Sequence, residues 1–164
     1  MVNINKSLLN KNNFRLLIDK IPNTEYYVKK CNIPGVSFSE LAHGAGVGLD
    51  AYFPGDRVTF ENLSVDFLVD EDLANFKEVY DWMNAIVPIK DPKDYGDYVK
   101  VDDEVSDITL ITTTNKNIPN RYFRFHDCFP IGLSGLEFES GADGESVVAT
   151  IEFKFTYYDI ESTS

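Results

Sequence analysis

Cysteine, histidine and tryptophan are scarce in this chain of 164 residues, which holds two, two and one of them. Cys31 and Cys128 have no CxxC neighbour, and no Cys/His cluster of the kind that binds zinc is present. Because Met1–Lys6 lacks the apolar stretch of a secretory signal, we expect two reduced thiols rather than a disulfide. His43 and His126 stand in no HExxH motif, so the sequence predicts no metal site and no cofactor.

Positive charge is also in short supply. The chain has 15 Lys and Arg against 27 Asp and Glu, which gives a formal net charge of −12. This excess of acid argues against nucleic acid or anionic lipid as an attractive partner. The acid is concentrated in residues 61–104, which hold 13 acids and four bases. No hydrophobic run approaches the ~20 residues that a membrane-spanning helix needs.

Aromatic and apolar residues, by contrast, are abundant. Twelve Phe and nine Tyr occur in a sequence that is 43% hydrophobic, and such residues suit broad sheet packing. A chain of this length can bury one core, so we expect a single domain over residues 13–160. Residues 1–12 are then an N-terminal arm and residues 161–164 a C-terminal tail.

Alternation of apolar and polar residues predicts strands along most of the chain. The clearest lies in residues 146–160, where Val, Ala, Ile and Phe occupy one face, and with residues 131–139 it forms an expected hairpin. The opposite face of this strand is the candidate polar sheet face, formed by Thr150, Glu152, Lys154 and Thr156. Further strands are expected at residues 14–18, 26–32, 63–69, 107–114 and 121–128.

One substantial helix is expected at about residues 72–87, where apolar residues recur three or four apart before Pro88. Asp70, Glu71 and Asp72 precede it, and we expect these carboxylates to cap its N-terminus. Seven or eight strands with one helix and no βαβ alternation predict a mainly β fold with one flanking helix. It consists of two packed antiparallel sheets or a partly closed β-barrel.

A long hairpin-like excursion with a glycine-rich tip is expected at about residues 38–54. It ends in a predicted structural turn, because proline and glycine supply the backbone angles of tight turns. The residues of this turn are Pro54, Gly55, Asp56 and Arg57.

The motifs that usually indicate catalysis or ligand binding fail in this sequence. Gly44–Gly48 lacks a Rossmann pattern because Leu49 stands where a small residue is required, and it has no P-loop ending. Calcium binding by the acids of residues 91–104 would need oxygen ligands where Lys93 and Tyr95 stand. No GxSxG elbow is present, so we predict that the protein is not an enzyme.

Several segments occur in an order and spacing that resemble the tail tube proteins of contractile-tailed bacteriophages. The resemblance covers roughly residues 13–160. The segments that carry it are Phe14–Ile18, Cys31–Gly35, Pro54–Phe60, Val65–Glu71, Trp82, Arg121–Pro130 and Ile151–Tyr158.

The resemblance implies a structural protein of two packed β-sheets that forms hexameric rings. The rings stack into a hollow tube inside a contractile sheath, a fold shared with tubes of extracellular injection particles and type VI secretion. The implied partners are copies of the chain itself, a sheath protein, and baseplate or initiator and terminator proteins. DNA passes through without specific binding, sometimes after a tape-measure protein. The implied location is the virion, with assembly in the host cytoplasm.

The family uses the equivalent of the glycine-rich excursion to contact the next ring. The candidate inter-ring stacking loop therefore comprises Leu41, His43, Gly44, Gly46, Gly48, Tyr52 and Phe53. Open sheet edges would be satisfied when six subunits join edge to edge, and we expect the loop and the N-terminal arm to become ordered on assembly. We also expect a polar lumen with net negative potential, because a basic lumen would hold DNA.

Two other interpretations remain open from sequence alone. The chain could be a tube initiator, a baseplate component or a secretion-system tube ring of the same fold. From a different class, it could be a small β-barrel enzyme or ligand-binding protein that uses a cleft beside Tyr80 and Trp82. That alternative requires polar groups converging in a pocket.

Overall fold

The computed structural model describes residues 7–44, 46, 48–87, 104–141 and 144–162. Strands dominate this part of the chain, so the prediction of a mainly β protein is confirmed. The elements are β1 (Phe14–Ile18), α1 (Pro22–Tyr26), β2 (Val28–Cys31), β3 (Val36–Gly44), β4 (Asp50–Phe60), β5 (Leu63–Leu68), α2 (Ala74–Ile86), β6 (Ser106–Thr113), β7 (Pro119–Leu133), β8 (Val148–Lys154) and β9 (Tyr157–Ser162).

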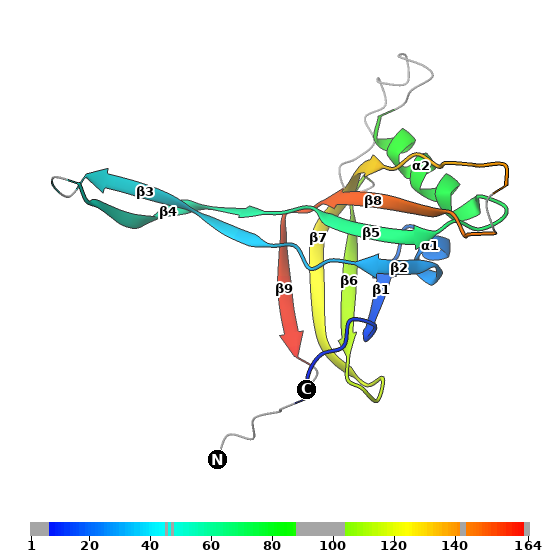
Figure 1. Ribbon diagram of the computed structural model, residues 1–164, viewed down its shortest axis with the longest axis horizontal. Coiled ribbons are helices and arrows are strands. Elements are labelled where there is room, and N and C mark those ends of the chain that lie inside the picture. The colour runs from blue at the N-terminus through cyan, green and yellow to red at the C-terminus, as the bar shows by residue number, and fades with distance from the viewer. Residues whose placement is uncertain (1–6, 45, 47, 88–103, 142–143, 163–164) are drawn as a thin grey trace.

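Seven strands form one antiparallel sheet in the order β1-β6-β7-β8-β5-β2, with β9 added to β7, and β3 pairs with β4 as a separate ribbon. The long strand β7 divides the larger sheet. Its residues 121–126 pair with β9, beside β6, whereas residues 129–133 pair with β8. We call β1, β6, β7 and β9 layer 1, and β7, β8, β5 and β2 layer 2. Figure 1 shows the two layers running crosswise, without closing into a barrel.

The hydrophobic core lies between the two layers. In β5 every second residue is buried, as the alternation in residues 63–69 predicts. Each fully buried Phe, Leu or Ile contributes roughly 1.5–3 kcal/mol relative to an exposed position. The core residues of the strands are Leu16, Ile18, Ile108, Leu110 and Phe125 from layer 1, and Leu63, Val65, Phe67, Ala149, Ile151 and Phe153 from layer 2.

Helix α2 covers one end of this core, and its observed bounds agree with the expected helix. The Trp82 ring lies 5.8 Å from the Phe153 ring, and its Nε1–H donates to the Glu104 carbonyl at 2.8 Å. A short helix that we did not expect, α1, lies between β1 and β2. No helix in the described ranges is long and apolar enough to cross a membrane.

The expected single strand at residues 146–160 is wrong, because the chain breaks into β8 and β9. Phe155 and Tyr158 both place their rings against Phe125, at 5.2 and 5.4 Å. In a continuous strand, residues three positions apart point to opposite faces of the sheet, so Phe155 and Tyr158 could not both reach Phe125. The strand therefore breaks between them. The separate strand expected at residues 131–139 is also wrong, since β7 runs without interruption from Pro119 to Leu133.

The expected acidic cap of α2 is also wrong. The helix begins at Ala74 with Leu73 at the N-cap in a left-handed conformation (φ 56°), and no capping side-chain hydrogen bond is present. Asp70, Glu71 and Asp72 instead form a turn with Leu73, whose N–H donates to the Asp70 carbonyl at 3.0 Å. This turn keeps the three carboxylates out of the first helical turn.

The buried side chain of Asn75 fastens the start of α2 instead. Its Nδ2 donates to the Leu68 carbonyl at 2.7 Å, and its Oδ1 accepts from the backbone N–H groups of Phe76 and Asp70 at 2.8 and 3.3 Å. The Asn75 carbonyl also accepts from the Thr24 hydroxyl at 3.2 Å, which joins α1 to α2. The side-chain amide of Asn75 therefore ties the end of β5 to the start of α2, and its backbone carbonyl adds the link to α1.

Both ends of the expected domain can be compared with the structure only in part. Residues 7–12 have no helix or strand, and residues 1–6 lie outside the described residues. At the other end β9 continues to Ser162, so the first two residues of the expected tail belong to a strand. The expected acidic loop, with its rejected calcium ligands, lies outside the described residues except for Glu104.

We predict that Asn75→Ala lowers the free energy of unfolding by about 1–3 kcal/mol, because it leaves buried backbone groups without partners. Urea unfolding followed by circular dichroism measures the change. Asn10→Ala is the matched control, since it removes one exposed hydrogen bond to Asn115, and it should cost less than about 0.5 kcal/mol. Equal effects of the two substitutions would contradict the role given to Asn75.

Candidate assembly interface

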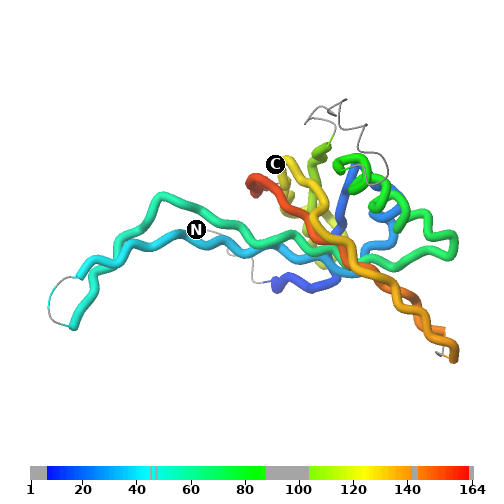
Figure 2. The backbone as a smooth tube through the Cα atoms, turned by 90° about the horizontal axis from the view of Figure 1, so that it is seen from above, coloured from blue at the N-terminus to red at the C-terminus, as the bar shows by residue number. Residues whose placement is uncertain are grey.

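The β3–β4 ribbon projects from the domain as an arm, as Figures 1 and 2 show from two directions. Every residue of β3 is exposed. Large apolar side chains on the arm face solvent, with Leu41 63%, Tyr52 64% and Phe53 55% exposed. An isolated two-stranded ribbon is marginally stable in water, and a concentration of exposed apolar groups marks an interaction surface.

The residues of the candidate stacking loop all lie on the outer part of this arm. Leu41 pairs with Phe53 and His43 with Ala51 in the β3–β4 register, and residues opposite each other share a face of the ribbon. Gly46 and Gly48 stand near the tip with φ of 140° and 82°, which explains why glycine is used there. Ala45 and Val47 lie outside the described residues. The contact with another ring remains a prediction.

The expected tight turn at Pro54–Arg57 is wrong, because these residues lie within β4 as a β-bulge. The register shifts between the pairs Phe38–Val58 and Glu40–Pro54, so the extra β4 residues bulge opposite Ser39. The Arg57 N–H donates to the Ser39 hydroxyl at 3.1 Å. Any Cβ at Gly55 would come 2.7 Å from the Ser39 carbonyl oxygen. Proline and glycine here mark a bulge, which also accommodates them in strands.

The candidate polar sheet face lies mainly on the side of layer 2 that faces away from the core. Thr150, Glu152 and Lys154 alternate along β8 with buried Ala149, Ile151 and Phe153. Thr156 is exposed but falls in the break between β8 and β9. The structure therefore brings three of the four candidate residues together on one strand.

Neighbouring strands extend this polar face into a charge-balanced network. The Thr150 hydroxyl donates to Asp66 Oδ1 at 2.8 Å, and Lys30 Nζ lies 3.9 Å from Asp66 Oδ2. The Asn62 side chain bridges Glu152 and Lys154. Its Nδ2 donates to Glu152 Oε2 at 3.3 Å, and its Oδ1 accepts from Lys154 Nζ at 3.2 Å. Acidic and basic side chains thus alternate across the face.

Layer 2 has two free edges among the described strands. One is β2, which pairs only with β5, and the other is the part of β7 formed by residues 129–133, which pairs only with β8 in this layer. Unpaired backbone groups on a sheet edge can accept a strand from another chain. The sequence predicts the strands themselves from their alternation, but it does not indicate which of them lie at an edge of the sheet.

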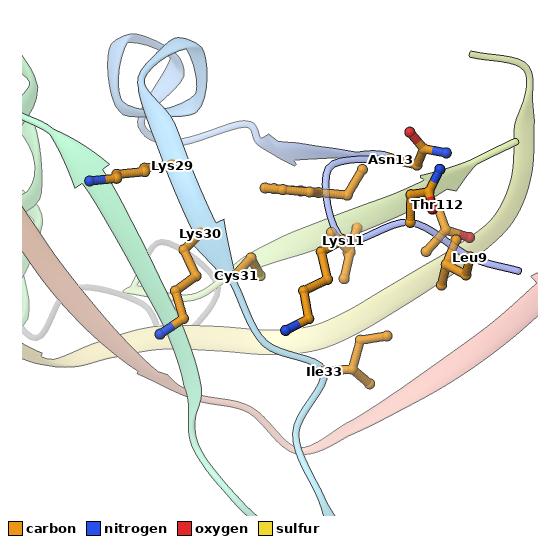
Figure 3. A pocket seen from close by; sticks show the side chains of 11 residues that line it. Leu9, Lys11, Asn13, Lys29, Lys30, Cys31, Ile33 and Thr112 are labelled. Atoms are coloured by element: carbon orange, nitrogen blue, oxygen red, sulfur yellow. The ribbon is translucent and has the colours of Figure 1, made fainter. Parts of the chain in front are cut away.

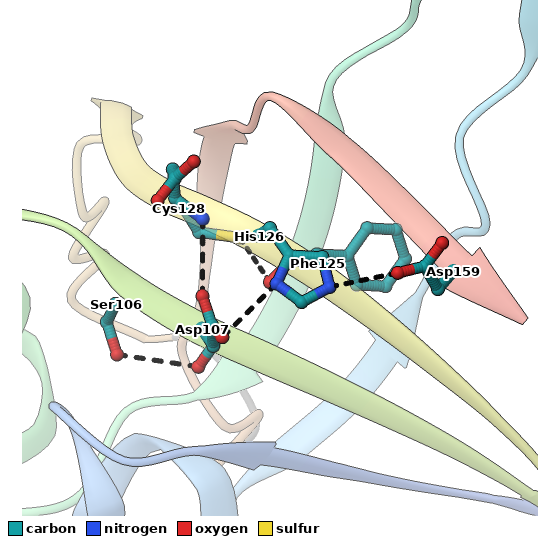
Figure 4. A network of polar contacts seen from close by, with 7 residues as sticks. Ser106, Asp107, Phe125, His126, Cys128 and Asp159 are labelled. Atoms are coloured by element: carbon teal, nitrogen blue, oxygen red, sulfur yellow. Dashed lines mark hydrogen bonds and ion pairs between the residues drawn. The ribbon is translucent and has the colours of Figure 1, made fainter. Parts of the chain in front are cut away.

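A polar cluster on layer 1 joins three of its strands (Figure 4). The two ring nitrogens of His126 lie 3.3 Å from Asp107 Oδ2 on β6 and 3.3 Å from Asp159 Oδ2 on β9. The imidazole also stacks on Tyr157, with ring centroids 4.6 Å apart. Since it connects β6, β7 and the edge strand β9, His126 fastens an edge of layer 1.

The cysteine beside this cluster is a poor nucleophile. The Cys128 thiol is buried and points to the Phe125 carbonyl at 3.4 Å. Burial is the largest cause that raises its pKa to about 12. A thiol with so high a pKa stays protonated at neutral pH, which disfavours catalysis. Among the described residues, no group of three or more His, Cys, Asp and Glu could hold a metal ion.

The ligand-binding alternative expected a cleft beside Tyr80 and Trp82. A groove of about 630 Å³ does include Tyr80 in its wall, but Trp82 is only 5% exposed and lies in the core. Apolar side chains form most of the wall, and its polar side chains besides Tyr80 are Asn84 and Ser134, so the cleft expected beside Tyr80 and Trp82 is not the one present.

An exposed ribbon, open sheet edges and a charge-balanced face define a structural protein that acts through its surfaces. A family model described as phage tail tube protein matches residues 3–161, so the chain belongs to that family. The resemblance found in the sequence is confirmed, and the family consists of structural tube proteins, not enzymes. No curated protein sequence matches the chain.

Solved structures of contractile injection particles share this fold. The cap that terminates the anti-feeding prophage tube is 16% identical, covers 98% of this chain and 95% of its own, and gives a TM-score of 0.68. A chain of the extended PVC sheath–tube complex is 16% identical, covers 96% of this chain and 94% of its own, and gives a TM-score of 0.67. A chain of the PVC sheath/tube terminator is 17% identical, covers 96% of this chain and 99% of its own, and gives a TM-score of 0.69. At these identities the likeness establishes the fold.

We predict that both thiols react slowly in the folded protein. Burial raises the pKa of Cys31 and of Cys128 to about 12, so the thiolate fraction at pH 8 is on the order of a thousandfold below that of an ordinary cysteine. Ellman's reagent measures the rate in buffer, and in urea both cysteines should react fully. Fewer than two reactive thiols after unfolding would contradict the expectation of reduced cysteines.

Proposed function

We propose that this chain is the repeating subunit of a tail tube. Six copies form a ring, and the rings stack into a hollow conduit inside a contractile sheath, through which DNA passes without specific binding. The observation that carries the proposal is the pair of free edges on layer 2, β2 and residues 129–133 of β7.

The direction of the strands supports ring closure. The pairs β7–β8, β8–β5 and β5–β2 are all antiparallel, so β2 runs opposite to β7. A neighbouring copy that places its β7 beside β2 therefore continues the antiparallel order. Repetition of this head-to-tail contact by rotation closes a ring and satisfies both edges.

The polar face of layer 2 supports the choice of lumen. If layer 2 forms the inner wall, the face with Lys30, Asp66, Glu152 and Lys154 lines the conduit. These four charges balance, so they offer DNA no cluster of cations to hold it through counterion release. This face alone gives no net negative potential, so the negative lumen expected from the sequence would need acids outside it and stays a prediction, as does a tape-measure protein in the lumen.

The arm supports stacking between rings. Leu41, Tyr52 and Phe53 expose apolar surface far from the core, and a neighbouring ring would cover that surface. The other partners we propose are a sheath protein around the tube and baseplate, initiator and terminator proteins at its ends. The proposed location is a phage tail or related injection particle that assembles in the host cytoplasm.

A second candidate is a ring that ends the tube rather than repeats along it. Similarity to an anti-feeding prophage tube cap and to a PVC terminator favours this alternative. An initiator, baseplate or secretion-system ring belongs to the same group. A repeating subunit stacks without limit, whereas an end ring stops after one layer.

We predict that the purified full-length chain, when concentrated, forms rings and tubes with a central hole in negative-stain images. Tubes of indefinite length would support the repeating subunit, and single rings would support the end ring. Monodisperse globules at every concentration, confirmed by sedimentation, would overturn the proposal.

Deletion of residues 43–49 tests the role of the arm in stacking. The shortened subunit should keep its circular dichroism spectrum and thermal midpoint, because the flanking parts of β3 and β4 are largely exposed. It should no longer form tubes. Tubes of normal length from this variant would show that the stacking role given to Leu41, His43, Tyr52 and their neighbours is wrong.

A further inference from the structure

An apolar groove accompanies each free edge of layer 2. The first, which we call the β1–β2 groove, has a volume of about 640 Å³ and lies between the N-terminal segment, β1 and β2. The second, the α2–β7 groove, has a volume of about 630 Å³ and lies between α2 and the end of β7. Both are open to solvent in the isolated subunit, and each lies beside one of the two unpaired strands.

The β1–β2 groove combines an apolar floor with a positive rim. Figure 3 shows Leu9 and Lys11 on the N-terminal segment across from Cys31 on β2 and Ile33 just beyond it. Lys29 also lines the groove, at its far end, with its side chain extending away from the others. Lys30 also lines the groove, but its ammonium lies 3.9 Å from Asp66 on the polar face of layer 2. Such a grouping of lysines is unusual in a chain with 15 basic residues and a net charge of −12.

The N-terminal segment that forms one wall of this groove is held in place. The Asn13 carbonyl accepts from the Thr113 N–H at 3.0 Å, and the side chains of Asn10 and Asn13 both donate to Asn115 Oδ1 at 2.9 Å. The wall is therefore part of the folded subunit and positions Leu9 and Lys11 beside β2.

The α2–β7 groove is apolar and has acids close by in the chain. Tyr80, Val87 and Ile131 line it and are 47%, 53% and 45% exposed. The chain continues from its lining residues Ser134 and Gly135 along the edge of β8, where the Ser134 N–H donates to the Thr150 carbonyl at 2.9 Å. It then presents exposed Glu137 and Glu139 on either side of Phe138, which is 76% exposed.

We propose that the two grooves are the two sides of one contact between copies of this chain. The β1–β2 edge of one copy packs against the α2–β7 groove of the next, and Lys11 and Lys29 pair with Glu137 and Glu139 of that neighbour. This inference rests on the proposed ring function and names the residues that make the ring specific.

The positions of the two grooves favour a second copy of this chain as the partner that fills them. The grooves lie at opposite edges of the same layer, so the rotation that pairs β2 with a neighbour's β7 also brings the grooves together. The surfaces differ in charge, basic on one side and acidic on the other, so the contact is head-to-tail and cannot close as a symmetric dimer. Complementary charges of this kind set partner choice and register more than raw affinity.

Charge reversal on full-length protein tests the pairing. The variants are Lys11→Glu/Lys29→Glu, Glu137→Lys/Glu139→Lys, and the fourfold combination of both. Each double variant should raise the concentration needed for ring formation by about tenfold or more, because like charges then face each other. The fourfold variant should recover most of the loss, since it restores opposite charges across the contact. Sedimentation velocity measures the ring fraction.

Arg15→Glu/Lys116→Glu is the matched control, because it reverses two exposed cations, on β1 and on the turn between β6 and β7, that line neither groove. It should form rings like the unaltered chain, and circular dichroism should show all variants folded. Double variants that form rings normally, or a fourfold variant no better than either double, would overturn the groove pairing while leaving the tube function intact. An unaltered chain that forms no rings at any concentration would overturn both.

Discussion

The backbone hydrogen bonding of β7 is the constraint on which the rest of this fold depends. This 15-residue strand pairs with β6 along residues 119–128, with β9 along residues 121–126 and with β8 along residues 129–133. Between the residues that pair with β9 and those that pair with β8, Asp127 takes a left-handed φ of 55°, and the strand passes from one layer to the other. The core therefore forms between two layers that one strand holds together, and neither layer could be positioned without it.

The same arrangement creates the surfaces for assembly. Because β7 enters layer 2 only with its last residues, it leaves an unpaired edge there, opposite the unpaired edge of β2. A closed barrel would have satisfied both edges within one chain and left nothing to join. In the proposed ring, neighbouring copies would meet that requirement, and the apolar grooves beside the two edges would add surface that assembly can bury.

Sequence reasoning succeeded where one local pattern decides the structure. The alternation in β5 and the three-to-four spacing in α2 each face a single core, so side-chain polarity alone indicates which residues are buried. It failed where tertiary contacts compete with the local pattern. Phe155 and Tyr158 both pack against Phe125, which breaks the expected strand. The buried Asn75 side chain, rather than the carboxylates of residues 70–72, makes the hydrogen bonds at the start of α2. The pairing of β7 with two layers, which leaves the free edges, depends on residues distant in sequence and left no local signal.

The position of the arm links ring closure to stacking. β3 follows β2 after a short connection from Cys31 to Val36, and β4 enters β5 across only Glu61 and Asn62. The ribbon is thus an extension of the β2–β5 pair, although it has no core of its own. A neighbour that pairs with β2 would fix the edge from which the arm emerges, and so reduce the conformational freedom that stacking must otherwise remove. In the proposed tube, lateral and axial contacts would then reinforce each other, because both act on the same pair of strands.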